Sequence, residues 1–79
     1  MKHKHEYVET YKGLVGFGLD RKTNEDTVIV YLQKFSDDNL MELLRSRLTD
    51  EELGEIFNLI SRLLYQKLSE KEYHTCFLK

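Results

Sequence analysis

The residues of this chain best suited to chemistry are three histidines and one cysteine, placed near the two ends of the sequence. His3 and His5 lie in the basic segment 1–5. A free amino terminus, backbone amides and His3 can together hold Cu(II) or Ni(II) in a square plane. Chain ends rich in lysine and histidine are usually solvated, however, so we expect residues 1–5 to be disordered.

His74 and Cys76 form the second group of chemical interest, two residues apart near the C-terminus. On a helix this spacing directs them to different sides, and no glycine turn that could build an oxyanion hole accompanies them. The simpler expectation is that Cys76 helps to seat a C-terminal helix. A metal-responsive protein that uses the terminal histidines and Cys76 is kept as an alternative function, and it requires the two chain ends to meet.

The acidic residues gather where helices are expected to begin. Thr49 and Glu52 have the spacing of a capping box, and Ser69 and Glu72 repeat it. Ser36 opens a looser version of the same pattern. Acids in a first turn are favoured by the helix dipole, so capping explains their positions without catalysis. The chain also lacks P-loop, GxGxxG and HExxH motifs, and we expect no catalytic, cofactor-binding or metal-binding residues.

The apolar pattern predicts that a helix from Asp50 to Leu68 forms the centre of the fold. One stripe at helical spacing contains Leu53, Ile56, Phe57, Ile60, Leu63, Leu64 and Leu68. Phe57 and Ile60 lie in mid-stripe and are predicted to be fully buried. Three apolar residues that do not fit the neighbouring stripes form a possible interaction surface: Met41, Leu59 and Tyr65.

The N-terminal third also carries a helical pattern. Its apolar members are Tyr7, Val8, Tyr11, Leu14 and Val15, and Gly18 is expected to end the helix in a left-handed conformation. Gly13 and Gly16 each cost about 1 kcal/mol in a helix interior. A glycine-rich strand is therefore left open for this segment.

The run from Thr27 to Tyr31 is β-branched or aromatic throughout, so it has the composition of a strand. Read with a helical period, however, Val28 and Leu32 share one face with Phe35. A strand would need a partner, and the chain offers only the glycine-rich segment 12–19. We therefore predict a helix over 24–34, with a short strand at 27–33 as the alternative.

With that strand, the layout resembles a ribbon-helix-helix DNA-binding domain: a strand, a helix over 36–47 and a helix over 49–68. The resemblance covers about half the chain and is architectural. It implies that alternating strand residues read bases in the major groove. Only Lys34, at the edge of one face, is basic, and carboxylates open the second helix where phosphate contacts are expected. DNA binding is kept as an alternative function, although we expect no nucleic-acid partner.

The composition bounds the remaining possibilities. The chain has 79 residues, which is one domain's worth, and its net charge of −2 is spread evenly along it. No run of apolar residues is long enough to span a membrane, and a single cysteine suits the reducing cytoplasm. The sequence predicts a single all-α domain over 1–79, a small bundle of four to five helices. We expect a cytoplasmic, non-catalytic interaction or regulatory module whose partner is another protein or a second copy.

Overall fold

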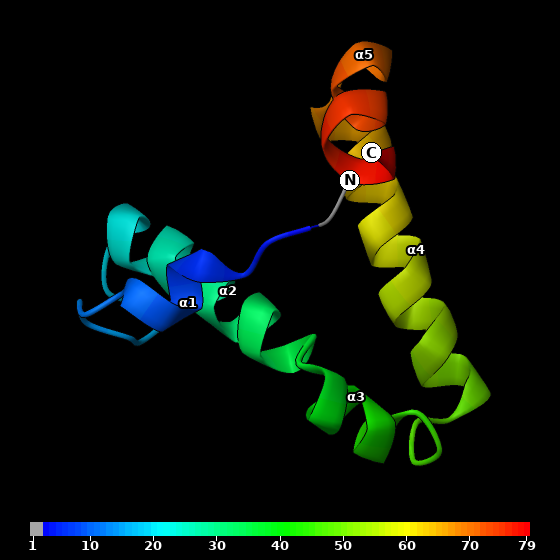
Figure 1. Cartoon of the computed structure of the whole chain (residues 1–79), viewed down its shortest axis with the longest axis horizontal. Helices are drawn as coiled ribbons and strands as arrows, with labels where there is room; N and C mark the ends of the chain where they lie inside the picture. Colours follow the sequence, from blue (N-terminus) through cyan, green and yellow to red (C-terminus); the bar gives the residue numbers. More distant parts are fainter. Residues whose placement is uncertain (1–2) are drawn as a thin grey trace. The chain divides into compact units, whose positions relative to one another are not determined.

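The computed structural model describes residues 3–79, and this part of the chain is all-α, as predicted. Five α-helices and a π-helical segment follow one another, with no strand between residues 3 and 79 (Figure 1). They are α1 (Glu6–Thr10), α2 (Arg21–Phe35), α3 (Asp38–Leu44), α4 (Asp50–Lys67), α5 (Glu70–Glu72) and the π-helical η1 (Tyr73–Leu78). None of these helices combines the length and the apolar character needed to cross a bilayer.

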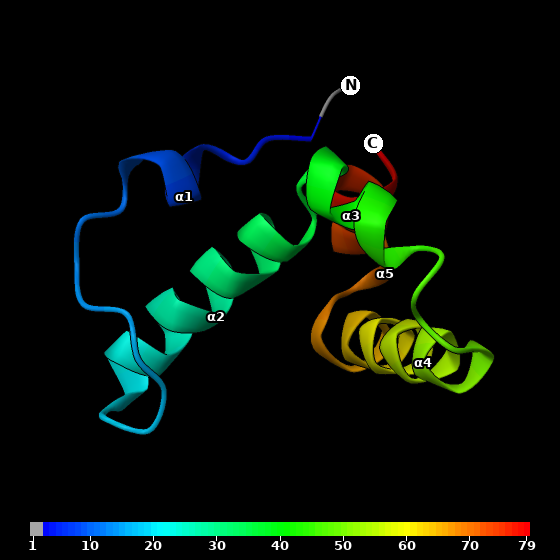
Figure 2. The same cartoon turned by 90° about the horizontal axis from the view of Figure 1, so that it is seen from below.

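Residues 3–79 divide into two compact units. His3–Arg45 contains α1, α2 and α3, and Ser46–Lys79 contains α4, α5 and η1. In the first unit α1 lies beside α2 in both views (Figures 1 and 2). The single domain over 1–79 stays a prediction. So does the disorder of residues 1–5, of which 1–2 lie outside the described residues.

The ambiguous run at 27–33 is helical and belongs to α2, which confirms the prediction of a helix over 24–34. The helix begins earlier than expected because the Asp20 carboxylate caps it, accepting a hydrogen bond from the amide of Thr23 at 2.8 Å. Thr27 and Val30 are the buried residues of α2. Of the β-branched residues in the run, Thr27 and Val30 therefore pack against the rest of the unit, whereas Val28 and Ile29 are exposed. Residues 27–33 form no strand of the kind that a ribbon-helix-helix layout requires.

The predicted helix ending at Gly18 is wrong: α1 ends at Thr10, and no helix occurs between it and α2. Hydrogen bonds to α2 replace those that a longer helix would make. The amide and carbonyl of Gly16 both bond the Thr27 hydroxyl, at 2.9 and 3.1 Å, and the Gly18 amide donates to the Asn24 side chain at 2.7 Å. Gly18 does have a positive φ of 101°, but it lies in the turn before α2.

The caps of the last three α-helices follow the sequence closely. Both capping boxes form, with Thr49 and Glu52 at the start of α4 and Ser69 and Glu72 at the start of α5. The start of α3 differs from the prediction by one residue. Asp37 is its N-cap, whereas Ser36 closes α2 because its amide still donates to the Leu32 carbonyl at 3.0 Å.

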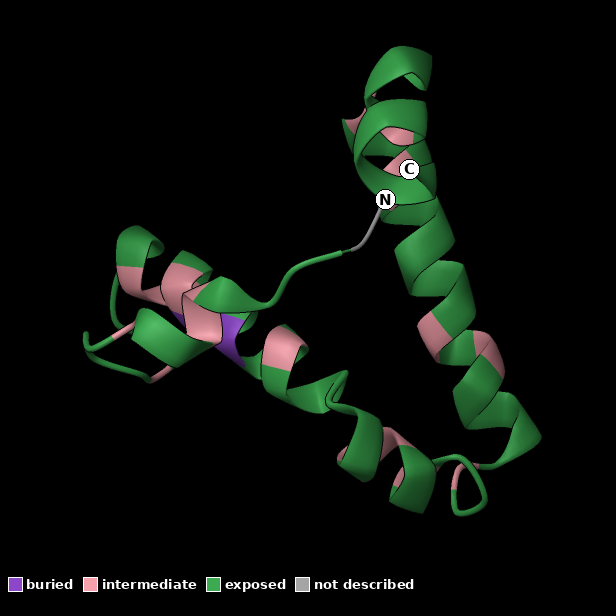
Figure 3. Ribbon diagram, viewed as in Figure 1, coloured by how far each residue is buried: buried purple, intermediate pink, exposed green. Residues whose placement is uncertain are grey.

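Burial contradicts one prediction. Phe57 and Ile60 were expected to be fully buried, but 69% of Phe57 and 43% of Ile60 is exposed. Within Ser46–Lys79 no other helix packs along the length of α4, so its apolar face is only partly covered. Leu64 and Leu68 are half-buried, and exposed residues make up most of α4 in Figure 3.

Candidate functional site

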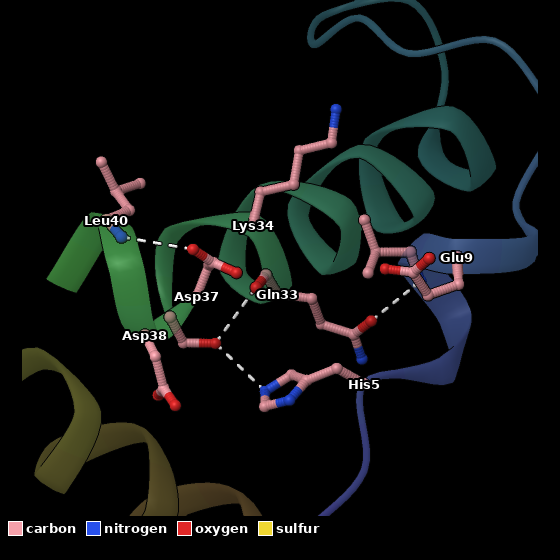
Figure 4. Close-up of a pocket in the computed structure, with 9 residues that line it drawn as sticks. His5, Glu9, Gln33, Lys34, Asp37, Asp38 and Leu40 are labelled. Atoms are coloured by element: carbon pink, nitrogen blue, oxygen red, sulfur yellow. Dashed lines mark hydrogen bonds between the residues drawn. The ribbon is translucent and has the colours of Figure 1, made fainter.

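A pocket of about 620 Å³, lined mainly by polar residues, lies in the unit His3–Arg45. It lies between the N-terminal arm, residues 3–10, and the junction of α2 and α3. Figure 4 shows side chains from both sides of it. His5 and Glu9 come from the N-terminal side, and the α2–α3 side supplies Gln33, Lys34, Ser36, Asp37, Asp38 and Leu40. The pocket therefore brings together acids, a lysine, a histidine and a hydroxyl, and it is the first place to look for chemistry.

Most of these polar groups are engaged in holding the structure together. The Val8 amide donates to Gln33 Oε1 at 2.9 Å, and His5 Nε2 lies 3.1 Å from Ser36 Oγ (Figure 4). Asp37 accepts from the Leu40 amide at 3.2 Å as the cap of α3. The hydrogen bonds in the pocket thus hold the N-terminal arm against the end of α2.

The Ser36–His5 pair has the separation of a nucleophile and its general base. Ser36 Oγ also donates to the Gln33 carbonyl at 3.2 Å, and both side chains lie in exposed residues. No described carboxylate is hydrogen-bonded to His5 to orient its ring. The pair therefore supplies two parts of a nucleophilic site without the third group or the water exclusion that such a site uses.

A tyrosine–aspartate cluster lies on the same unit, between α1 and the start of α2. Asp26 Oδ1 accepts from the Tyr7 hydroxyl at 2.5 Å, and Asp26 Oδ2 accepts from Lys22 Nζ at 3.0 Å. The Tyr11 hydroxyl reaches Asp26 Oδ2 at 3.4 Å, and the rings of Tyr7 and Tyr11 stack with centroids 5.3 Å apart. One carboxylate thereby joins three side chains from two separate parts of the chain.

The protonation states in this cluster follow from its hydrogen bonds. The bond to Asp26 raises the pKa of Tyr7 to about 12, because the bond and the negative charge both favour the protonated phenol. Donation from Tyr7 and then Lys22 holds the pKa of Asp26 below its ordinary value. At neutral pH Asp26 is charged and Tyr7 is neutral. The hydrogen bond between them therefore stabilises the contact between α1 and α2, and Tyr7 keeps its proton.

The residues predicted from the chain ends do not form one site within either unit. His3 and His5 belong to His3–Arg45, whereas His74 and Cys76 lie in η1 of Ser46–Lys79. The His74 ring meets Tyr73 edge-on at 5.8 Å, and Cys76 is exposed. Among residues 3–79 no three His, Cys, Asp or Glu side chains converge as metal ligands would. Met1, which the amino-terminal chelate needs, lies outside the described residues.

An apolar groove of about 660 Å³ is the main surface feature of the unit Ser46–Lys79. One wall is the apolar face of α4, and the other is formed by the C-terminal segment, where the Tyr73 and Phe77 rings stack at 5.4 Å. The apolar and aromatic residues that line the groove are Phe57, Ile60, Leu64, Tyr65, Leu68, Tyr73 and Phe77. Such a groove presents aliphatic and aromatic surface suited to binding another apolar surface.

The three residues predicted as an interaction surface lie in different places. Tyr65 lines the groove and is 88% exposed. Leu59 is 49% exposed and is not among the groove residues, because it lies about 160° around α4 from Phe57. Met41 is half-buried on α3, in the other unit. A common surface of these three stays a prediction, and the stripe residues Phe57 and Ile60 join Tyr65 at the groove.

The Tyr7–Asp26 contact and the Ser36–His5 pair were not predicted from the sequence. Their partners are 19 and 31 residues apart, so no helical period relates them. Comparison of the chain with protein-family models, curated proteins and solved structures gave no match. The candidate site therefore has to be judged from its own residues.

Proposed function

We propose that this protein is a small, non-catalytic module that acts by binding protein through the apolar groove of Ser46–Lys79. The observation that carries the proposal is the exposure of Phe57 at the centre of a strongly patterned helix. Fully burying a side chain of this kind stabilises a complex by roughly 1.5–3 kcal/mol, so several such residues on one face supply a substantial driving force for association.

The polar groups of the molecule support the same choice. In the pocket of His3–Arg45 the side chains of His5, Gln33 and Ser36 are already bonded to one another or to the backbone. The Asp26 carboxylate is likewise engaged by Tyr7 and Lys22. These groups stabilise the fold, whereas the apolar and aromatic residues of the groove have no such role within Ser46–Lys79 and are available to a partner.

We also place the protein in the cytoplasm, where the exposed, unpaired thiol of Cys76 would stay reduced. Its regulatory role would then depend on which protein occupies the groove. Neither the distribution of charge nor the helical 27–33 run favours a nucleic-acid partner.

The test is photo-cross-linking inside cells at two positions of the same helix. A benzophenone amino acid placed at Phe57 lies in the groove, whereas one placed at Glu55 lies on the opposite side of α4. We expect a reproducible protein adduct from position 57 and none from position 55. An absence of intermolecular adducts from position 57, or equal adducts from both positions, would overturn the proposed function.

A further inference from the structure

The exposed face of α4 contains a pattern that is symmetric about the middle of the helix. Along one line of the helix lie, in order, Asp50, Leu53, Phe57, Ile60, Leu64 and Lys67. Their spacings are three, four, three, four and three residues, so the order of spacings is the same from either end. Four apolar residues lie between a charged residue at each end, an acid at one end and a base at the other. The centre of this seam lies between Asn58 and Leu59.

The spacing of the seam has a direct structural meaning. Steps of three and four residues average 3.5, which keeps a row of residues on one side of a helix against a neighbouring helix. Leu53, Phe57 and Ile60 are exposed, and Leu64 is half-buried beside the C-terminal segment. The seam is therefore a helix-packing surface that Ser46–Lys79 does not cover with its own residues.

We propose that a second copy of this chain covers the seam, with the two α4 helices packed antiparallel about a two-fold axis between Asn58 and Leu59. The proposal rests on the proposed function, since it names the protein that binds the groove. In this arrangement Leu53 lies level with Leu64 of the second copy, and Phe57 lies level with Ile60 of the second copy. Each pair of residues at one level forms a layer, and the two-fold axis repeats both pairs. The seam residues therefore form four successive apolar layers.

The distribution of charge along α4 favours the antiparallel orientation of the two helices. The first turn carries Asp50, Glu51 and Glu52, and Lys67 lies in the last turn. An antiparallel pair places Asp50 level with Lys67 of the second copy at each end of the seam. A parallel pair would place the three carboxylates of one helix against the same three of its partner, which is repulsive.

The symmetry also favours a copy of the same chain over an unrelated protein. A two-fold interface must be complementary to itself, so each residue must suit the residue at the mirrored position. The seam meets this condition at all six positions, pairing apolar with apolar residues and acid with base. Tyr73 and Phe77 on the second wall of the groove add apolar surface beside the partner helix.

The first experiment measures self-association of the full-length chain by sedimentation equilibrium over a wide concentration range. We expect a reversible dimer. Ile60→Glu should raise its dissociation constant at least about a hundredfold, since it places a carboxylate in two of the four layers. Leu59→Glu is the matched control, because Leu59 directly precedes Ile60 in the sequence, is similarly exposed at 49%, and lies outside the seam.

Two results of this experiment would overturn the proposal. One is a wild-type chain that stays monomeric at every concentration, and the other is an equal effect of Leu59→Glu and Ile60→Glu. Circular dichroism of each variant shows whether it remains helical. If the chain is monomeric while the photo-reactive residue at position 57 captures a different protein, self-association fails and the proposed function stands.

The second experiment tests the orientation and does not depend on the glutamate variants. Leu53→Cys and Leu64→Cys are made separately in a Cys76→Ser background, mixed and oxidised. The antiparallel pair brings position 53 level with position 64 of the other copy and separates the two positions 53 by about 16 Å along the axis. We expect the mixed 53–64 disulfide to predominate. Predominance of 53–53 and 64–64 disulfides would show a parallel pair and overturn the geometry.

Discussion

Asp26 connects more of the unit His3–Arg45 than any other single side chain described. Its two oxygens bond Tyr7 and Lys22 closely and Tyr11 at a longer distance, so α1, the following loop and α2 meet at one carboxylate. Hydrogen bonds between charged and neutral groups are stronger than those between neutral groups. The attachment of the N-terminal arm to α2 therefore depends on the charge of this residue.

Replacing Asp26 by Asn should lower the thermal midpoint of the protein at pH 7 and flatten its acid dependence. The pKa of Asp26 is lowered in the folded state, so its contribution is present above the ordinary value of 3.8 and is lost as pH falls through the lowered pKa. Thermal denaturation followed by circular dichroism between pH 2 and pH 7 measures both effects. Glu25→Gln is the control, since Glu25 lies beside Asp26 and pairs with the exposed Arg21; an equal effect would contradict the role of Asp26.

Tyr7 should ionise only at high pH. Its pKa is raised to about 12 by the Asp26 bond, so the neutral phenol stabilises the fold below pH 10 and this stabilisation is lost as pH rises through about 12. Ultraviolet titration of the phenolate should show a late step that Tyr7→Phe removes and Tyr31→Phe, on exposed Tyr31, preserves. A late step that survives Tyr7→Phe would assign it to a different residue.

Helix α2 shows how a helix can form from residues that individually favour strands. Asp20 caps its start, Arg21 and Lys22 pair with Glu25 and Asp26 one turn later, and Thr27 and Val30 are buried. The cap, the ion pairs and the burial all act over one or two turns. Together they outweigh the β propensity of the Thr27–Tyr31 run.

Two glycines, one before α2 and one inside α4, should respond oppositely to alanine. Gly18 has a φ of 101°, so Gly18→Ala should lower the free energy of unfolding by about 1 kcal/mol. Gly54 is helical with no atom within 4 Å of an added Cβ, so Gly54→Ala should raise it by about 0.5–1 kcal/mol. Urea denaturation of both variants beside the wild type checks the signs, and a shift of the same sign in both would contradict the argument.

The exposure of the apolar face of α4 determines how much stability is lost when Phe57, at its centre, is replaced by alanine. Phe57→Ala should change the free energy of unfolding of the monomer by less than about 1 kcal/mol, whereas a buried phenylalanine costs about 3–5 kcal/mol. Val30→Ala is the contrast, because Val30 is buried and should cost about 2 kcal/mol. Denaturation at low protein concentration makes the comparison. A larger loss from Phe57→Ala would mean that the face is covered within one chain.

At the scale of the whole molecule, the distribution of charge limits the class of partner. The net charge is −2, and ten of the twelve Lys and Arg residues lie outside the basic segment 1–5, spread along the rest of the chain. We therefore expect a mixed-sequence DNA duplex at physiological salt to bind no tighter than the roughly 10⁻⁴–10⁻⁶ M of nonspecific contacts. Fluorescence anisotropy measures this directly. Submicromolar binding that weakens steeply with added salt would contradict this prediction and support a nucleic-acid-binding function.

The features that could be predicted from the sequence are those set by neighbours within one or two turns. The capping boxes at Thr49 and Ser69, the helix over 24–34 and the all-α class depend on contacts between residues three or four apart. The apolar stripe of α4 was predicted for the same reason. A residue pattern states which side chains share a face of a helix.

Tertiary structure decided the features that depend on distant parts of the chain. Thr27 bonds the backbone of Gly16 and Tyr7 bonds Asp26 across long stretches of sequence, and the N-terminal helix ends at Thr10 rather than at Gly18. The exposure of Phe57 was likewise not predictable from the pattern. The physical reason is the same in both cases: periodicity identifies an apolar face, but burial requires a second surface to cover it, and local sequence does not specify where that surface comes from.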